Sequence, residues 1–440
     1  MKKVITYGTF DMLHEGHIRL LERARALGDY LIVGVTTEQF DLSRGKLNTR
    51  ESLAERMAAV RDTGLADLVI AEEYLGQKID DVRRYQVDIF TVGSDWVGVF
   101  DYMSDYCEVV YLDRTEGISS TKLREQRGYL PIGIVGGMPV IKKFVDESRF
   151  VSGVEISGAY GPVSGWGIPG CDSYTSFEDL LEGCNAVYVA CSPDERSNFV
   201  ERALAAGKHV ICETPMAMST SVVDRLFKMA DDRGLILMDA LKTAYLTAFS
   251  RLCLMAKSGA VGKIVSVDAT CTSMTGDAAI KRYLGGSFGN WAPTALLPII
   301  EILGDEWESC SLVSVADSER ESDAFSRLCL VYGGAIAEAT VASGAKSEGA
   351  LTISGTKGYL YVPSPWWKTD YFELRFEDAT RNKRFFYQMD GEGLRYEIAA
   401  FSKAVEQGVG ADLRVSRGVS RSIVRVFQER AEGVLPTINL

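Results

Sequence analysis

Short apolar runs alternate with amphipathic segments over the first 127 residues, and no other feature of the sequence restricts the fold as strongly. The apolar runs have the length of strands buried on both faces, and they read KVITYG, YLIVGVTT, DLVIA, DIFTVG and CEVVYL. Between the first two runs, Ile18, Leu21 and Ala24 recur at the spacing of one helix face. Strands that alternate with helices form parallel sheets, so residues 1–127 are predicted to form a Rossmann-like α/β domain.

A second alternating series begins at Leu130. Its predicted strands read PIGIVGG, VEISGAY, AVYVACS, HVICE and LILMDA, and its helices FVERALAAG and VVDRLFKMADDRG each end at a glycine. From about residue 264 the strands become longer and are separated by turn glycines, as in antiparallel sheets. The predicted fold class is therefore α/β, with a second Rossmann domain over 130–250 and a mixed α+β open-sheet domain over 251–440.

Charge and cysteine usage narrow the functional classes. The net charge of −12 argues against a protein that holds nucleic acid by broad electrostatic attraction. The first apolar run is too short for a signal peptide, and no run has the length of a membrane helix. The nine cysteines include no C-x-x-C pair, which favours reduced thiols over zinc or disulfide frameworks. We therefore expect a cytoplasmic protein with no membrane span, no nucleic-acid partner and no metal site built from its own side chains.

Two of the three histidines, His14 and His17, lie in one stretch, GTFDMLHEGHIRLL, directly after the first predicted strand. This position is the carboxyl end of a parallel strand and the start of a helix, where open α/β sheets bind ligands. Free amides at a helix start favour phosphate oxygens, and two imidazole donors can stabilise charge that develops on a phosphorus under attack. Gly16 between them lets a phosphate approach the backbone. Two surface histidines at a helix cap are the alternative interpretation.

A second anion-binding segment, RTEGISSTKLR, follows the strand CEVVYL at Arg114–Arg124. Ser119, Ser120 and Thr121 offer hydroxyls and amides at a predicted helix start, and the Arg114 guanidinium can bind phosphate oxygens in a bidentate manner. Alone, the segment could be an ordinary capped helix. Together with the histidine stretch it is predicted to close over a triphosphate.

Residues 1 to about 127 resemble the glycerol-3-phosphate cytidylyltransferase family through KKVITYGTFD, HEGHI, LLERA, LGDYL, YCEVVYL and RTEGIS. The resemblance implies a Rossmann-like nucleotidyltransferase domain that converts CTP and glycerol 3-phosphate into CDP-glycerol and pyrophosphate, without a covalent enzyme intermediate. Mg²⁺ is expected to bridge CTP oxygens, mostly through water and phosphate. The implied biological context is teichoic acid or a related surface polymer.

The resemblance also implies roles for individual residues. The implied catalytic residues are His14, His17, Lys46 and Arg114. The residues implied to line the nucleotide site are Thr9, Phe10, Asp95, Thr115, Gly117, Ile118, Ser119, Ser120 and Thr121. The acceptor phosphate is expected to contact Arg44, Arg56 and Lys78. Arg44 and Ser94 depart from the family pattern, and these departures weaken the assignment of the acceptor more than that of CTP.

Residues of about 130–440 resemble the glucose–fructose oxidoreductase and inositol dehydrogenase family through CSPDERSNFVERALAAGKHVICETPMA and ISGTKGYLYVPSPWW. The resemblance implies NAD(P) as a cofactor, but the functional positions depart from the family. Met138 stands at the second fingerprint glycine, where it would obstruct a pyrophosphate. Thr214 replaces the family lysine, and Trp291 and Ala295 replace its aspartate and histidine. NAD(P) binding is therefore doubtful, with Lys242 and Tyr245 left as possible substitutes for the lost proton donor.

Three functions follow from these observations. The first is a CTP-dependent transferase acting on a polyol phosphate, fused to a degenerate dehydrogenase-like module. The second is a bifunctional enzyme whose C-terminal module makes or modifies the polyol phosphate with NAD(P)H. The third is a binding protein with a vestigial nucleotide site, against which the intact HEGH and RTEGISST stretches argue. We favour the first, with small-molecule substrates and a homo-oligomeric assembly. His209, Trp366 and Trp367 are interpreted as structural residues.

Overall fold

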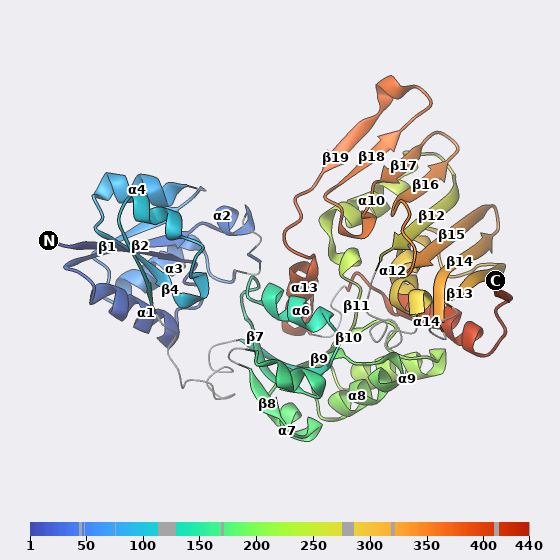
Figure 1. Ribbon diagram of the computed structural model, residues 1–440, viewed down its shortest axis with the longest axis horizontal. Helices are drawn as coiled ribbons and strands as arrows, with labels where there is room; N and C mark the ends of the chain where they lie inside the picture. Colours follow the sequence, from blue (N-terminus) through green and yellow to red (C-terminus); the bar gives the residue numbers. More distant parts are fainter. Residues whose placement is uncertain are drawn as a thin grey trace. The chain divides into compact units, whose positions relative to one another are not determined.

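The computed structural model describes residues 1–43, 46–47, 49–74, 76–112, 129–168, 171–274, 286–317, 322–408 and 413–439. The chain forms two compact units (Figure 1). Unit 1 comprises Met1–Pro131 with Arg149–Glu155, and unit 2 comprises Ile132–Ser148 with Ile156–Leu440. The domain limits expected from the sequence stay predictions.

Unit 1 is built on a parallel five-stranded sheet with the order β3-β2-β1-β4-β5. The strands are β1 (Lys3–Gly8), β2 (Tyr30–Thr36), β3 (Leu68–Glu72), β4 (Ile89–Gly93) and β5 (Glu108–Leu112). The helices are α1 (Glu15–Arg25), α2 (Glu38–Ser43), α3 (Leu53–Asp62) and α4 (Gln77–Tyr85). The strand order reverses between β1 and β4, and such a switch point opens a crevice beyond the carboxyl ends of these two strands.

Alternating side chains of the strands supply two separate cores, one on each face of this sheet. Val4, Leu31 and Val33 pack with Leu21 and Ala24 of α1 and with Val60 of α3. On the opposite face, Ile5, Ile32 and Phe90 pack with Val82 of α4. Burial on both faces explains why the strands are mostly apolar, instead of alternating between apolar and polar residues.

Unit 2 contains a six-stranded sheet with the order β11-β10-β9-β6-β7-β8. The strands are β6 (Leu130–Gly136), β7 (Val154–Tyr160), β8 (Asp172–Tyr174), β9 (Ala186–Ala190), β10 (His209–Glu213) and β11 (Leu237–Ala240). The pairs β6–β9, β9–β10, β10–β11 and β7–β8 are parallel. The helices are α6 (Val140–Ser148), α7 (Phe177–Glu182), α8 (Pro193–Ala205) and α9 (Thr220–Asp232).

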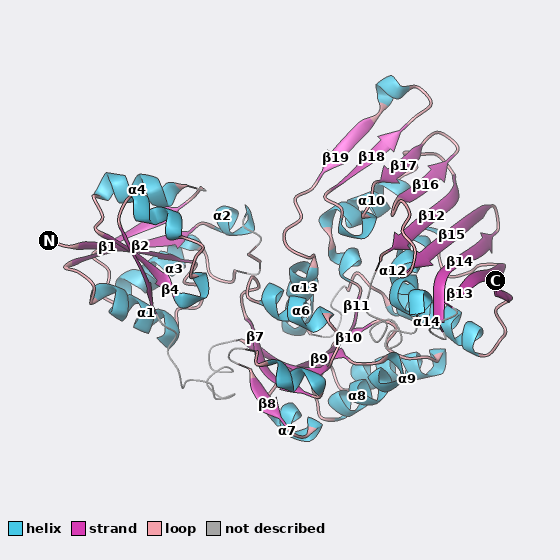
Figure 2. Cartoon of the chain, viewed as in Figure 1, coloured by secondary structure: helices cyan, strands magenta, loops and turns pink. Residues whose placement is uncertain are grey.

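The second sheet of unit 2 has nine strands in the order β19-β18-β17-β16-β12-β15-β14-β13-β20 (Figure 2). The strands are β12 (Ile264–Thr272), β13 (Ser309–Asp317), β14 (Ser322–Tyr332), β15 (Ala335–Ala342), β16 (Leu351–Gly355), β17 (Tyr359–Val362), β18 (Tyr371–Arg375), β19 (Lys383–Phe386) and β20 (Thr437–Asn439). The helices are α10 (Thr247–Lys257), α12 (Gly286–Leu303), α13 (Leu394–Gln407) and α14 (Arg417–Ala431).

Most pairings in the nine-stranded sheet are antiparallel, and only β12–β15 and β13–β20 are parallel. Helix α12 packs on β12, β14 and β15 and covers the middle of the sheet. The predicted fold class, two Rossmann-like parallel sheets and a mixed open sheet, is confirmed. Within the described part of the chain, no helix combines the length and apolarity that crossing a membrane requires.

Candidate functional site

The loop between β1 and α1 has an unusual backbone conformation. Phe10 and Met12 have φ values of 52° and 50°, a left-handed conformation that bulky side chains rarely adopt. Phe10 is nevertheless buried, so its ring anchors the loop in the core. Backbone strain of this kind persists only where the surroundings hold it, and it concentrates at functional sites.

Carboxylates on both sides hold the loop in place. Asp11 accepts hydrogen bonds from the backbone amides of Arg50 and Glu51, at 3.1 and 3.0 Å. In return, Glu51 Oε2 accepts from the amide of Met12 at 2.7 Å. This reciprocal arrangement fixes residues 11 and 12 before the chain enters α1. The loop is therefore preorganised rather than ordered only when a ligand binds.

The two predicted histidines lie at the start of α1 with their rings stacked. The ring centroids of His14 and His17 are 3.9 Å apart, and the planes differ by 17°. His14 is the N-cap residue of α1, and its Nδ1 accepts the amide of Gly16 at 3.1 Å. A Cβ atom at residue 16 would lie only 3.0 Å from Cε1 of His14, so glycine lets the ring fold over the helix end. The spacing inferred from the sequence thus brings both imidazoles to the predicted phosphate-binding position.

Aromatic neighbours orient the two rings. Phe10 meets His17 edge-on with centroids 5.4 Å apart. Tyr129, which precedes β6, meets His14 edge-on at 5.9 Å, and its hydroxyl lies 3.4 Å from Nε2 of His14. The sequence reasoning missed Tyr129. The only available signal was its aromatic ring next to the predicted domain limit, because 115 residues separate it from His14.

Arg56 was predicted to contact the acceptor phosphate, but its guanidinium is fully buried among protein groups. Nη1 donates to the carbonyl oxygens of Thr9 and Thr36, at 2.8 and 2.7 Å, and Nε donates to the carbonyl of Glu51 at 3.0 Å. Asp41 lies beside it and accepts from the hydroxyls of Thr9 and Thr36. These contacts give Arg56 a positioning role, because it ties together the ends of β1 and β2.

Lys78 and Lys46 are the other described cations of the predicted site. Lys78 on α4 pairs with the buried carboxylate of Glu72 and lies over the Tyr7 ring at 4.6 Å. Burial, and to a smaller extent the negative charge of Asp81, raises the pKa of Tyr7. The Asp81 carboxylate accepts a hydrogen bond from the Tyr7 hydroxyl at 2.9 Å. The backbone amide of Lys46 donates to the carbonyl of Asp41 at 2.8 Å. The substrate roles of both lysines stay predictions.

The remaining predicted residues cannot be placed. Ser94–Trp96 form a 3₁₀ turn after β4, but the side chain of Asp95 is outside the described part. The following predicted residues also lie outside the described residues: Arg44, Arg114, Thr115, Gly117, Ile118, Ser119, Ser120 and Thr121. Their assignment to the triphosphate stays a prediction.

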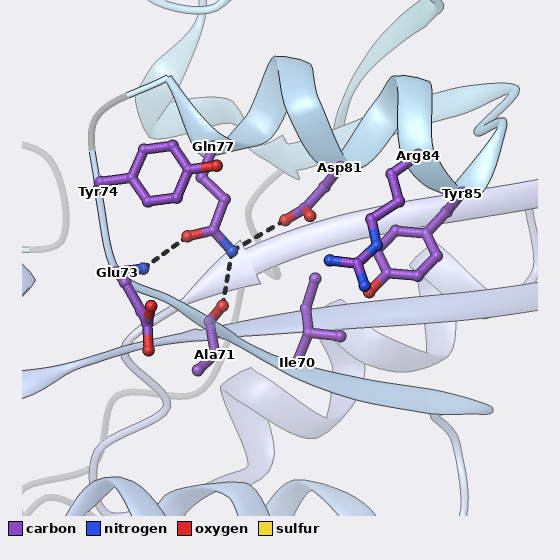
Figure 3. Close-up of a pocket in the computed structure, with 8 residues that line it drawn as sticks. All are labelled: Ile70, Ala71, Glu73, Tyr74, Gln77, Asp81, Arg84 and Tyr85. Atoms are coloured by element: carbon purple, nitrogen blue, oxygen red, sulfur yellow. Dashed lines mark hydrogen bonds between the residues drawn. The ribbon is translucent and has the colours of Figure 1, made fainter.

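Unit 1 also has a pocket of about 270 Å³ between β3 and α4 (Figure 3). Its lining residues are Ile70, Ala71, Glu73, Tyr74, Gln77, Asp81, Arg84 and Tyr85. The Gln77 amide accepts from the Glu73 backbone at 2.7 Å and donates to Ala71 O at 2.7 Å and to Asp81 Oδ2 at 3.1 Å. No residue predicted for CTP or the acceptor lines this pocket, and the Gln77 amide is occupied by internal bonds. The pocket is therefore separate from the described residues that were predicted to bind the substrates.

The first of the dehydrogenase-like positions, Gly136 and Met138, lie at the carboxyl end of β6. Gly136 has a φ of 126°, and a Cβ atom there would collide with the Ala190 carbonyl, so this fingerprint glycine is required. The Met138 side chain is buried and its Sδ lies 3.4 Å from Nη2 of Arg196. Strand β7 ends at Tyr160 without an acid for a ribose. These residues do not fit NAD(P) in the usual manner.

Packing residues lie at the positions where the family resemblance implies an aspartate and a histidine. Ala295 is fully buried, and Trp291 donates from Nε1 to Ser273 Oγ at 3.2 Å. Trp366 is buried and donates to the carbonyl of Thr270 on β12 at 3.1 Å, which confirms its structural role. His209 accepts the amide of Ile236 at 3.0 Å, and burial lowers its pKa. His209 is therefore also structural, as predicted.

Buried acids accompany Thr214 at the ends of β10 and β11. Burial raises the pKa of Glu213, whose Oε1 accepts the Tyr188 hydroxyl at 2.5 Å. Burial likewise raises the pKa of Asp239 to about 7. Lys242 lies just after β11. Burial lowers its pKa most, and the positive charge of Lys368 lowers it further. Among the described residues, no group of three or more histidine, cysteine or acidic side chains has an arrangement that could hold a metal ion.

Comparison with known proteins separates the chain into two similarities. Residues 5–126 match the cytidylyltransferase-like family model, and residues 164–240 match the model of the oxidoreductase family with an NAD-binding Rossmann fold. The glycerol-3-phosphate cytidylyltransferase of Bacillus spizizenii is 48% identical over 130 residues, which is 30% of this chain and 100% of that protein. The Staphylococcus aureus enzyme of the same name is 50% identical over 126 residues, which is 29% of this chain and 95% of that protein.

The second similarity is structural. A 3-ketoreductase from Actinomadura kijaniata, solved in complex with NADP and TDP-benzene, superposes with a TM-score of 0.62 at 20% sequence identity. The match covers 71% of this chain and 99% of the reductase. At this level of identity the similarity establishes the fold of unit 2 and leaves its activity open.

Proposed function

Because the chain belongs, through unit 1, to the glycerol-3-phosphate cytidylyltransferase family of nucleotidyltransferases, we propose that it transfers the cytidylyl group of CTP to glycerol 3-phosphate, giving CDP-glycerol and pyrophosphate. The stacked pair His14 and His17 carries this proposal. The pair lies at the start of α1 and at the switch point of the sheet, where phosphate groups bind in folds of this type.

The reaction requires positioning and charge stabilisation rather than an enzyme nucleophile. A phosphate oxygen of glycerol 3-phosphate attacks the α-phosphorus of CTP, and the bond to the bridging oxygen of the β-phosphate breaks as pyrophosphate leaves. Negative charge grows on the oxygens around the α-phosphorus. The donors that stabilise it are His14, His17 and amides of the first turn of α1 other than that of Gly16, which donates to His14, and the fixed loop keeps them in place before reaction.

The remaining assignments follow from the family match. Lys46 and Arg114 bind the β- and γ-phosphates. Mg²⁺ would be held mostly by CTP itself rather than by side chains of this chain, and it would neutralise phosphate charge. Lys78 and Arg44 bind the acceptor phosphate. Asp95 and the 115–121 segment, together with Thr9 and Phe10, surround the nucleotide. The predicted homo-oligomer and the supply of CDP-glycerol for a surface polymer belong to the same proposal.

A pyrophosphate-release assay tests the substrates. We expect release with CTP and glycerol 3-phosphate, and a kcat/KM at least about tenfold lower when ATP replaces CTP or when ribitol 5-phosphate replaces the acceptor, because a polar site rejects analogues that leave its groups unpaired. A higher kcat/KM with ribitol 5-phosphate would refute glycerol 3-phosphate as the acceptor. Absence of release with CTP and every polyol phosphate would refute the proposal.

For unit 2 we propose a degenerate dehydrogenase-like module without hydride chemistry. The missing family lysine, aspartate and histidine support this, since Thr214, Trp291 and Ala295 offer no proton donor. A bifunctional enzyme is the second candidate. The partly buried Lys242 favours it, because its lowered pKa suits proton transfer near the carboxyl ends of β10 and β11.

Thr214→Val separates these two candidates. If unit 2 is degenerate, Thr214→Val should leave cytidylyl transfer unchanged. The wild type should also bind no NADPH, so a titration should give no change in NADPH fluorescence. A Lys242→Met variant serves as the matched comparison, because it removes the substitute donor. NADPH binding by the wild type that supports reduction and is lost in Lys242→Met would establish the bifunctional enzyme instead.

A further inference from the structure

Three lysines of unit 2 converge on one carboxylate, and we call this group the lysine cluster: Lys143, Lys242, Lys368 and Glu392. Lys143 Nζ and Lys242 Nζ lie 3.1 and 4.0 Å from Oε2 of Glu392, and Lys368 donates a hydrogen bond to the same oxygen. The lysines come from α6, from the 3₁₀ turn η4 (Lys242–Tyr245) and from the 3₁₀ turn η5 (Trp366–Lys368). Segments distant in sequence therefore contribute to one site.

The segment that carries Glu392 is rigidly held. Gly391 and Gly393 on either side have φ values of 60° and 84°. Arg395, in the first turn of α13, forms a buried two-bonded ion pair with Glu147 of α6, at 2.7 and 3.1 Å. Helices α6 and α13 lie side by side (Figure 1). A Cβ atom at Gly391 would collide with the Glu147 carboxylate, so only glycine allows this close approach. The position of Glu392 is thus set by the fold.

The charges within the cluster do not balance. Burial opposes ionisation of Glu392, but hydrogen bonds from Lys368 and Lys143 outweigh it and lower the pKa of Glu392 to about 2. One ionised carboxylate therefore faces three lysine side chains. Between a quarter and a half of each cluster side chain is exposed, from 24% for Lys242 to 51% for Lys143, so a small anion can reach the group. Like charges held close together are costly unless an anion is present between them.

Two polar residues of unit 2 have buried side-chain oxygens that lack hydrogen-bond partners among the described residues, and one of them, Glu397, lies within electrostatic reach of Lys242. Glu397 is fully buried, and neither of its carboxylate oxygens has a hydrogen-bond partner among the described residues. The hydroxyl of Thr214 is also buried and has no hydrogen-bond partner among the described residues. Lys242 lies within electrostatic reach of Glu397 and Glu213. Buried polar groups without partners are unfavourable, and hydroxyl groups of a ligand would satisfy them.

We propose that the lysine cluster binds the phosphate group of a small polyhydroxylated molecule, whose hydroxyls bond to Glu397 and Thr214. Glu392 holds the three ammonium groups together in the absence of the ligand and moves aside, or shares them, when the phosphate binds. The site lies within unit 2 and its existence does not depend on cytidylyl transfer by unit 1. It gives the dehydrogenase-like module a ligand of the same chemical class as the proposed acceptor, and it requires no hydride chemistry.

Hydrogen–deuterium exchange of the full-length protein tests this site, because it separates the two units. Glycerol 3-phosphate, inorganic phosphate and glycerol are titrated in turn. We expect glycerol 3-phosphate to slow exchange in residues 140–148 and 390–397, inorganic phosphate to do so at higher concentration, and glycerol to have no effect. Protection around residues 9–17 reports on the proposed reaction site independently, so failure of one proposal is distinguishable from failure of the other.

Variants show whether the lysines bind the anion. Lys143→Gln and Lys368→Gln should each raise the glycerol 3-phosphate concentration for half-maximal protection by about tenfold or more, the loss expected for one charge-assisted hydrogen bond. Lys142→Gln, on the same helix and outside the cluster, should leave it unchanged. Glu392→Gln should lower it, because the competing internal anion is removed. If the cluster is purely structural, Glu392→Gln will not lower the glycerol 3-phosphate concentration for half-maximal protection.

Several results would overturn the proposal. These are no protection of residues 140–148 and 390–397 by any probe, equal protection in Lys143→Gln and the wild type, and no gain in Glu392→Gln. Equal half-maximal concentrations for inorganic phosphate and glycerol 3-phosphate would overturn the assignment of Glu397 and Thr214 to ligand hydroxyls.

Discussion

His14→Ala and His17→Ala will each lower kcat for CDP-glycerol formation by about 10²–10³-fold, the loss typical of removing one preorganised donor from a transition state. The expectation rests on the stacked rings at the start of α1 and on the loop that Asp11 and Glu51 hold in place. The donors act on charge that develops during attack, so KM for CTP should change less than kcat. Initial rates of pyrophosphate release over a range of CTP concentrations measure both parameters.

Arg19→Ala is the matched control for the histidine variants. Arg19 lies on the same helix, and its contact with Glu15 is a partly exposed i,i+4 ion pair, so its loss should alter kcat and stability little. The histidine variants should keep the far-UV circular dichroism of the wild type. If either variant retains kcat within about threefold of the wild type, the two imidazoles do not stabilise the transition state as argued.

Arg56→Ala will destabilise unit 1 by about 3–5 kcal/mol, the range found when one partner of a buried charged network is removed. The fully buried guanidinium donates to the carbonyls of Thr9, Thr36 and Glu51. Its removal takes this donor from the three carbonyls and a positive charge from beside the buried Asp41. Native-state hydrogen exchange of the β1 and β2 amides measures the change in unit 1 separately from unit 2.

Arg61→Ala provides the comparison on the same helix. Its side chain is exposed, and exposed substitutions usually change stability by less than about 0.5 kcal/mol. If Arg56→Ala unfolds no more readily than Arg61→Ala but loses affinity for glycerol 3-phosphate, then Arg56 is a substrate ligand, as the family resemblance implies, and not the positioning residue described here.

The parallel sheets were predictable because burial on both faces leaves a local signature. Mostly apolar runs such as the one from Val4 to Tyr7, followed by helical spacing at Ile18, Leu21 and Ala24, specify strand and crossover without knowledge of distant contacts. The position of the histidines was predictable for the same reason. Strand end, loop and helix start are consecutive in the chain, so local order alone brings His14 and His17 to the edge of the sheet.

Contacts between distant segments could not be inferred in this way. The burial of Arg56 depends on how α3 packs against the ends of β1 and β2, and the resemblance to a family of enzymes favoured a substrate role instead. The lysine cluster joins α6, η4, η5 and the start of α13, over a separation of 249 residues between Lys143 and Glu392. No local pattern in the sequence connects such groups.

The hydrogen bond from Gly16 to His14 has a further consequence for proton chemistry. Because Nδ1 of His14 accepts the Gly16 amide, that nitrogen carries no proton, and the neutral imidazole must exist as the tautomer protonated at Nε2. The helix end therefore selects which nitrogen bears hydrogen before any nucleotide binds. In this form His14 can donate a hydrogen bond from Nε2 to a phosphate oxygen without first taking up a proton from water.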